Sequence, residues 1–207
     1  EVEYGIRGFS LGSGTKLSYS SNSALIENLE ANTEYEAYVR ANCDLDGFSQ
    51  WSTVLRIKTD CDVISAPYKE SFVNTNVSPD CWSQSANGSW RFNKYASYGA
   101  SNIQDRSSLN NSNYAWLDGS YSAFNGDYLL KSPWVDISGL SNPSVTFSVF
   151  SKNTVNDIYN TLQVTLYDSD GTVFSDIITV NNDTNIWRDF VVDLGDYNFT
   201  SNTIQIE

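Results

Sequence analysis

Three cysteines, Cys43, Cys61 and Cys81, carry the most direct covalent chemistry in this chain. An odd number leaves at least one thiol free or paired outside the chain. Cys61 and Cys81 both lie where a second domain would begin, so we expect a disulfide between them. It would close a loop of 19 intervening residues and contribute about 3 kcal/mol of stability. The pair Cys43–Cys61 is an alternative that the sequence leaves open. A disulfide is typical of oxidising, extracytoplasmic compartments.

The other side chains give little support for catalysis. Histidine is absent, so no Ser-His-Asp or Cys-His system and no His-ligated zinc site can form from these residues. The cysteines form no CxxC pair, and no glycine-rich phosphate-binding motif occurs. Two carboxylates in a cleft could hydrolyse glycosides, but the string E-x-D-x-x-E is missing and most aspartates lie in turn-like stretches. We therefore expect a protein that is not an enzyme.

Aromatic side chains in polar stretches could bind a sugar, because pyranose rings stack on exposed aromatic faces. Tyr95 and Tyr98 lie in "FNKYASYGASN", and Tyr121 lies in "GSYSAFNGDY". We predict that these three tyrosines form a ligand-binding platform, with burial in the core as the alternative. The tryptophans in strand-like runs are instead expected to be core residues; they are Trp82, Trp90, Trp116 and Trp187.

The charge of the chain limits its partners. The formal net charge is -13, from 12 basic and 25 acidic residues, and both halves of the chain are acidic. Nucleic acids and anionic membranes require a positive surface, so neither is expected as a partner. No run of about 18 apolar residues is present, so no transmembrane helix is predicted.

The elements that must position these residues are strands. In "TEYEAYVRA" the side chains of Tyr35, Ala37 and Val39 alternate with polar ones, which is the period of a half-buried strand. The polar stretch "NLEANT" before it predicts a turn. Tyr35 therefore begins a strand after a turn, where its phenol can bond to the upstream backbone as in the tyrosine corner of Ig-like sandwiches. Strand-like runs in the first 60 residues cover 2–6, 17–21, 23–29, 35–43 and 52–59.

A second series of strand-like runs follows a short linker, "TDCDVISAPY". The pair Asp170-Gly171 lies between two such runs and predicts a β-hairpin. No stretch sustains the helical period, so the fold class is all-β, with a large sandwich or jelly roll in the second part. The runs cover 113–119, 127–140, 144–152, 161–171, 173–180 and 186–197.

Two families are similar to this chain. Residues 1–60, with "YGIRGFSLGSG" and "GFSQWSTVLRIKTDC", resemble the later strands of a fibronectin type III repeat whose N-terminal strands are absent. That likeness implies that Leu29, Tyr35 and Val39 are core residues. Residues 61–207, with "KESF", "SPDCW", "YLLKSPWVDISG", "PSVTFSVF" and "IWRDFVVDLGDY", resemble the jelly roll of MAM and cleaved-adhesin domains, with its C-terminal strand expected to be absent. Such domains belong to secreted multidomain bacterial proteins, and the likeness also suggests the Cys61–Cys81 pair.

The likeness to cleaved-adhesin domains further implies a structural calcium ion beside the first strand of the second domain. The acidic residue of the family's opening motif corresponds to Glu70 in "KESF", and Asp118 and Asp127 are its expected partners. Calcium takes six to eight oxygen ligands, which acidic turns can supply. The sequence therefore predicts a non-catalytic binding or adhesion module of a secreted or cell-surface protein, whose partner is a glycan or a surface protein. The alternative is a structural spacer that displays another domain.

Overall fold

The computed structural model describes residues 1–72, 77–85, 90–94, 96, 103, 106, 113–117, 128–151, 161–181 and 186–207. This part of the chain consists of strands β1 to β15 and two single-turn 3-10 helices, η1 (Asp44–Asp46) and η2 (Leu194–Asp196). The prediction of an all-β protein is therefore confirmed. Neither of these described helices is long or apolar enough to cross a membrane. The chain divides into two compact units, unit 1 (Glu1–Asp62) and unit 2 (Val63–Glu207).

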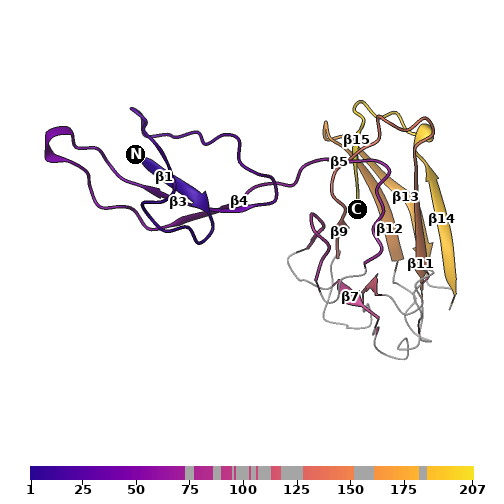
Figure 1. Cartoon of the computed structure of the whole chain (residues 1–207). Coiled ribbons are helices and arrows are strands. Elements are labelled where there is room, and N and C mark those ends of the chain that lie inside the picture. Colours follow the sequence, from indigo (N-terminus) through magenta and orange to yellow (C-terminus); the bar gives the residue numbers. More distant parts are fainter. Residues whose placement is uncertain are drawn as a thin grey trace. The chain divides into compact units, whose positions relative to one another are not determined.

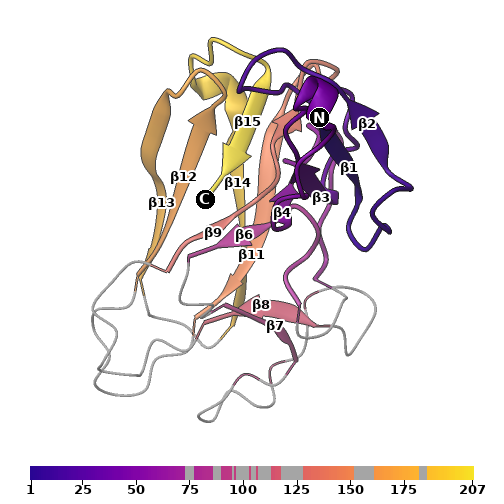
Figure 2. The same cartoon turned by 90° about the vertical axis from the view of Figure 1, so that its left-hand side faces the viewer.

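Unit 1 is one antiparallel sheet, of which Figure 1 labels β1, β3 and β4. Its strands lie side by side in the order β2-β1-β3-β4 (Figure 2). The strands are β1 (Val2–Ile6), β2 (Thr15–Leu17), β3 (Glu34–Val39) and β4 (Leu55–Lys58). The strand predicted over residues 23–29 does not form, and the one over 17–21 is reduced to Leu17. The stretch 23–29 contains Leu25, Ile26 and Leu29 but pairs with no described strand. The chain closes on itself here instead, with the Tyr19 hydroxyl donating to the carbonyl of Leu25.

The turn before β3 has the geometry that the sequence predicted. Asn28 and Asn32 adopt left-handed backbone angles, with φ of 59° and 48°, which asparagine tolerates better than most residues. The backbone N–H of Glu30 donates to the hydroxyl of Tyr35 at 2.9 Å. Tyr35 thus bonds back to the upstream backbone, as expected for a tyrosine corner.

The two faces of the unit 1 sheet differ in polarity. One face carries charged residues and is crossed by Phe9, whose ring lies against Gly5 and Gly14. A Cβ on Gly14 would come within 2.5 Å of that ring, so no larger residue fits there. The other face is apolar: Val2, Tyr35 and Ala37 are buried near its centre.

The margins of this apolar face are open to solvent. Ile6, Val39 and Leu55 are 55%, 50% and 57% exposed. The expectation that Val39 is a core residue is therefore wrong in this structure. The strand alternates as predicted, but nothing in the described part of unit 1 covers its end.

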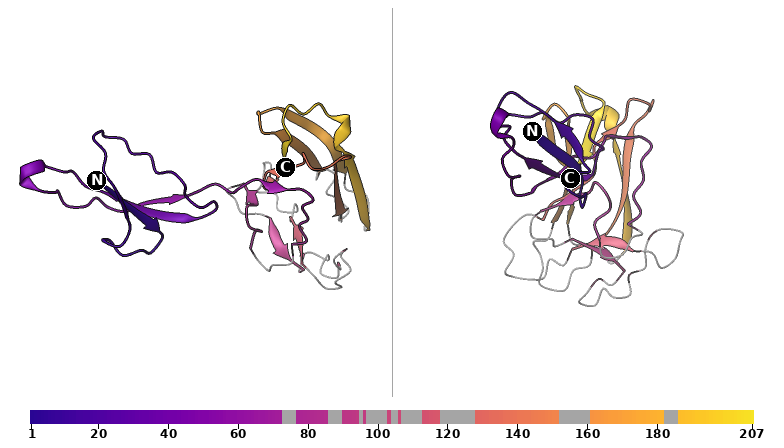
Figure 3. Two further views of the ribbon diagram at one scale, coloured as in Figure 1. Left: turned by 45° about the horizontal axis from the view of Figure 1, so that its top comes forward. Right: turned by 60° about the vertical axis from the view of Figure 1, so that its left-hand side comes forward.

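Unit 2 has two main layers, which Figures 2 and 3 show as separate groups of strands. The larger layer is a sheet in the order β13-β12-β15-β10-β5, in which only β10 and β5 are parallel. Its strands are β5 (Ile64–Ser65), β10 (Val135–Asp136), β12 (Thr161–Asp168), β13 (Val173–Asn181) and β15 (Thr203–Ile206). The second layer is the antiparallel pair β11 (Ser144–Phe150) and β14 (Trp187–Asp193).

The core of unit 2 lies between these layers. Leu166 of β12 is fully buried, and Ile204 of β15 and Val192 of β14 pack in the same cluster. The predicted hairpin at Asp170-Gly171 is confirmed, because β12 pairs with β13 across this turn and Gly171 has a φ of +94°. Ile64 and Ser65, which the sequence placed in the linker, instead form β5 at the edge of the sheet. The specific sandwich types of the two units stay predictions.

Two short strand pairs complete unit 2. They are β6 (Ser83–Gln84) with β9 (Leu130–Lys131), and β7 (Arg91–Asn93) with β8 (Tyr114–Trp116). The β7–β8 pair lies at one end of unit 2 and the β12–β13 turn at the other (Figure 2). A second hydrophobic cluster forms at the β7–β8 pair, where Tyr114 and Trp116 pack with Ala96, Ile103 and Trp187.

Candidate functional site

The opening segment of unit 2 holds the predicted metal ligand Glu70. This carboxylate accepts the backbone N–H of Phe72, and the hydroxyl of Tyr68 lies 3.5 Å from its Oε2 atom. Tyr68 in turn accepts the indole N–H of Trp82 at 2.8 Å. Burial raises the pKa of the Tyr68 phenol, the indole hydrogen bond lowers it, and the carboxylate of Glu70 raises it further. The phenol is therefore neutral at physiological pH and can donate to Glu70.

Cys61 and Cys81 are disulfide-bonded, so the predicted pair is confirmed and the alternative Cys43–Cys61 is wrong. Cys43 is a free and exposed thiol, next to η1 of unit 1. Trp82, which follows Cys81, contacts Phe72 edge to face at a centroid distance of 5.3 Å. The disulfide thus joins the residues before unit 2 to an aromatic cluster inside it.

The other predicted site residues lie outside the described residues. They are the three platform tyrosines and the two expected partners of Glu70: Tyr95, Tyr98, Tyr121, Asp118 and Asp127. The strands that precede and follow them in the chain are nevertheless described. Tyr95 and Tyr98 follow β7 and precede β8, while Asp118, Tyr121 and Asp127 lie between β8 and β9.

The β7–β8 pair gives these segments a packed base. Asn93 pairs with Tyr114 and Arg91 pairs with Trp116. The indole N–H of Trp116 donates to the side chain of Asn93 at 2.9 Å. The guanidinium of Arg91 lies 5.2 Å from the centre of the Trp116 ring. Phe92, between them, is 2% exposed. Both segments with the platform tyrosines therefore start from fixed residues.

Of the four tryptophans that the sequence predicted as core residues, Trp116 is buried, whereas Trp82, Trp90 and Trp187 are only partly buried. Trp90 donates its indole N–H to the carbonyl of Tyr128 at 2.9 Å. Trp187 contacts Tyr114 and Phe150 edge to face. The rings of Trp90, Trp116 and Trp187 are therefore each engaged in contacts within unit 2.

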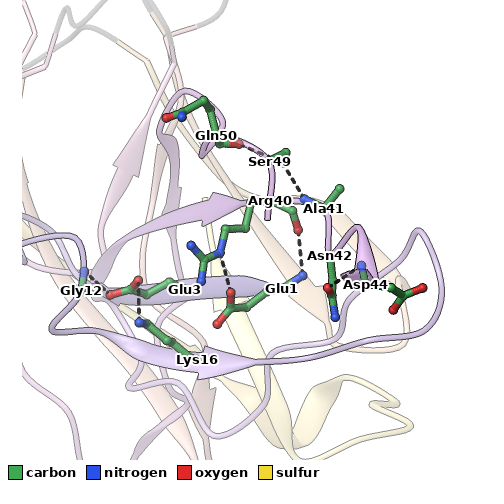
Figure 4. A network of polar contacts seen from close by, with 10 residues as sticks. All are labelled: Glu1, Glu3, Gly12, Lys16, Arg40, Ala41, Asn42, Asp44, Ser49 and Gln50. Carbon is green, nitrogen blue, oxygen red and sulfur yellow. Dashed lines mark hydrogen bonds and ion pairs between the residues drawn. The ribbon is translucent and has the colours of Figure 1, made fainter. Parts of the chain in front are cut away.

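Unit 1 contains a polar network that the sequence did not reveal (Figure 4). The side chain of Glu3 is fully buried and accepts the N–H groups of Gly12 and Gly14 at 2.6 and 2.9 Å. Lys16 lies 3.8 Å from its second oxygen. This carboxylate therefore fastens the β1–β2 loop to the sheet and is not free for a ligand.

Arg40 stands in the same network, where Figure 4 shows its guanidinium directed at Glu1. Its Nε atom donates to that carboxylate, and its guanidinium carbon lies 3.9 Å from the ring centre of Phe48 and 4.3 Å from that of Trp51. The hydrogen bond from Arg40 lowers the pKa of Glu1. Because its faces and one edge are already in contact, Arg40 is a poor candidate for binding an anionic ligand.

Asp168 is the buried carboxylate of unit 2 that corresponds to Glu3 of unit 1, and its role was likewise not predicted from the sequence. It is 1% exposed. The N–H groups of Thr200 and Ser201 donate to its Oδ2 atom at 2.6 and 3.2 Å, and the Ser201 hydroxyl donates to Oδ1. Burial raises the pKa of this carboxyl, but the hydrogen bonds outweigh burial and lower the pKa to about 2. Asp168 is therefore charged at physiological pH, and this charge fastens the loop before β15.

These contacts give the described residues structural roles. In this part of the chain, no three His, Cys, Asp or Glu side chains are close enough together to hold a metal ion. The buried carboxylates of Glu3, Glu36 and Asp168 each accept backbone N–H groups of nearby loops. The best candidate for a functional surface is thus the end of unit 2 that carries β7, β8 and the segments leaving them.

Comparisons with known proteins add no assignment. No protein-family model matches the chain, and no curated protein or solved structure is significantly similar to it.

Proposed function

We propose that this chain is a non-catalytic binding or adhesion module of a secreted or cell-surface protein, and that it contacts a glycan or a surface protein through the β7–β8 end of unit 2. One observation supports this choice. The segments that carry Tyr95, Tyr98 and Tyr121 both leave the β7–β8 pair, which is packed through Phe92 and Trp116. Loops on a fixed scaffold are where binding residues concentrate.

The disulfide and the charge of the chain agree with this proposal. A disulfide such as Cys61–Cys81 is stable in an oxidising compartment, which supports secretion. The net charge of -13 disfavours anionic partners, so a neutral glycan or a basic protein surface is favoured. The sandwich types proposed for the two units remain fibronectin type III and MAM or cleaved adhesin.

The proposal is tested with the full chain on a glycan array, followed by titration calorimetry of any glycan bound. We expect the triple variant Tyr95→Ala, Tyr98→Ala, Tyr121→Ala to lose binding. Tyr19→Ala is the matched control, because Tyr19 is an exposed tyrosine of unit 1. Unchanged binding by the triple variant would contradict the platform.

A structural spacer is the second candidate function, and the fastened loops favour it. Glu3 and Asp168 both use buried charge to hold a loop against a sheet, which stabilises a unit without creating an open site. If the chain binds neither a glycan nor a protein from the relevant cell surface, the spacer is the function that remains.

A structural calcium ion near Glu70 is part of the same proposal. Each oxygen of Glu70 has a single described hydrogen-bond contact, to Phe72 or Tyr68, so lone pairs remain for a cation. Its donor set would be complete only with Asp118 and Asp127. We expect millimolar calcium to raise the melting temperature by mass action and Glu70→Gln to abolish this shift. Identical melting curves in calcium and in EDTA would rule out the ion.

A further inference from the structure

The stretch of backbone that is bonded to neither unit is short. The boundary between the units lies after Asp62, and backbone hydrogen bonds hold the chain to each unit close to this point. On the side of unit 1, the N–H of Thr59 donates to the carbonyl of Thr33 at 3.0 Å, and the carbonyl of Asp60 accepts the N–H of Asn32 at 2.8 Å. The backbone is therefore fixed to unit 1 as far as Asp60.

On the side of unit 2, the backbone is fixed from Ile64 onward. The N–H of Ile64 donates to the carbonyl of Trp134 at 2.9 Å, and that of Ala66 donates to the carbonyl of Asp136 at 2.8 Å. Backbone hydrogen bonds alone would thus leave residues 61–63 as a linker. Three extended residues span about 10 Å, which would allow a wide range of orientations.

The disulfide removes this slack. Cys61 is the first linker residue, and its partner Cys81 belongs to a packed part of unit 2. The next residue, Trp82, donates its N–H to the carbonyl of the buried Pro79 at 3.1 Å and its indole N–H to Tyr68 at 2.8 Å. Asp60 is thus held by unit 1, and the residue that follows it is covalently held by unit 2.

We propose that the Cys61–Cys81 disulfide is a tether that stiffens the connection between the units. With the bond intact, the shortest covalent path from unit 1 to unit 2 runs through Asp60, Cys61 and the disulfide. Asp62 and Val63 lie inside the loop that the disulfide closes, so they do not lengthen that path. The tether restricts the range of orientations, whatever the preferred one is.

Two insertions of the same composition test this proposal in the full chain, in a Cys43→Ser background that prevents disulfide exchange. One variant carries Gly-Gly-Ser between Asp60 and Cys61, on the path between the units. The other carries Gly-Gly-Ser between Cys61 and Asp62, inside the closed loop. Thiol titration verifies that both retain the disulfide. The motion of each unit is measured by 15N relaxation, and the spread of shapes by small-angle X-ray scattering.

We expect the insertion before Cys61 to lower the rotational correlation time of unit 1 and to broaden the distribution of molecular dimensions. The insertion after Cys61 should match the parent protein in both measurements. Equal broadening by the two insertions, or no change with either, would overturn the tether. The variant Cys61→Ser, Cys81→Ser should behave like the first insertion. If this double variant does not fold, the comparison of the two insertion variants alone tests the tether.

Discussion

Single buried carboxylates do much of the positioning in this protein. Glu3 and Asp168 are both fully or almost fully buried, and each accepts at least two backbone N–H groups from a loop that is distant in sequence. Such charged acceptors form stronger hydrogen bonds than neutral ones. Removing one leaves buried donors without a partner, which costs more than the bond itself contributes.

The first prediction concerns Asp168. In Asp168→Asn the side chain loses its charge and one of its acceptor oxygens, so the donors of Thr200 and Ser201 are only partly satisfied. We expect the free energy of unfolding of unit 2 to fall by about 2 kcal/mol, measured by urea titration. Asp196→Asn is the control, because Asp196 is exposed and this change should be nearly neutral. Equal stability of the two variants would contradict the role of Asp168.

The second prediction concerns the stability of the folded chain at low pH. The pKa of Asp168 is about 2 in the folded protein, against an ordinary value of 3.8. Between these values the unfolded chain binds a proton that the folded one does not, so stability falls as pH falls. The contribution is fully present above the ordinary pKa and is lost as pH falls through about 2.

Thermal unfolding of the wild type and of Asp168→Asn, followed over this pH range, checks the effect. The carboxyl pKa values of Glu34, Glu36, Asp136 and Asp189 are also lowered, and these residues are present in both proteins. The difference between the two proteins therefore reports on Asp168, together with its charge interaction with Asp170, and should shrink toward low pH. A difference that stays constant would show that the carboxylate has its ordinary pKa.

At the scale of elements, the unit 1 sheet has one apolar and one charged face. Apolar and polar residues alternate along its strands, and the pairing register places residues of the same kind opposite each other. Val2 lies opposite Val39 and Ala37 opposite Leu55, so apolar side chains gather on one side. The charged residues Glu3 and Glu36 gather on the other, where loops and Arg56 cover them. The apolar margin remains exposed, and exposed apolar patches bind other apolar surfaces.

The third prediction follows from this open face. The dye ANS, which fluoresces on apolar surfaces, should bind the native chain, and the variant Val39→Lys, Leu55→Glu should bind it less. Leu45→Glu is the matched control, because Leu45 is fully exposed but lies in η1 and not on the sheet. A loss of fluorescence that is equal in the control would mean that the sheet face is not the binding surface.

At the scale of the whole molecule, a covalent bond supplements two modest cores. The disulfide Cys61–Cys81 restricts the unfolded chain at the start of unit 2. Five of the six tryptophans lie in unit 2, so the intrinsic fluorescence of the chain reports mainly on this unit.

The fourth prediction is that Cys61→Ser, Cys81→Ser lowers the free energy of unfolding of unit 2 by about 3 kcal/mol, measured by tryptophan fluorescence in denaturant. Cys43→Ser, which removes the exposed free thiol, should leave it unchanged. Thiol titration of the denatured, unreduced wild type should find one thiol. Three thiols would disprove the disulfide.

The sequence by itself determined the features that depend on neighbours along the chain. Alternation predicted β1 and most strands of unit 2, Asp170-Gly171 predicted the hairpin, and the turn before Tyr35 predicted its hydrogen bond to Glu30. The absence of histidine excluded whole classes of catalytic site. The disulfide could be proposed because cysteines form so few possible pairs.

Only the tertiary structure decided which side chains are buried and what they contact. Residues 23–29 were predicted as a strand but pair with no described strand, whereas Ile64 and Ser65 were predicted as linker and pair with β10. Val39 has the pattern of a core residue but lies where no described residue of unit 1 covers the sheet. Glu3 and Asp168 look like ordinary surface acids because their donors are 9 to 33 positions away. A pattern along the chain gives the direction of a side chain, but burial and hydrogen bonding depend on which distant residues meet it.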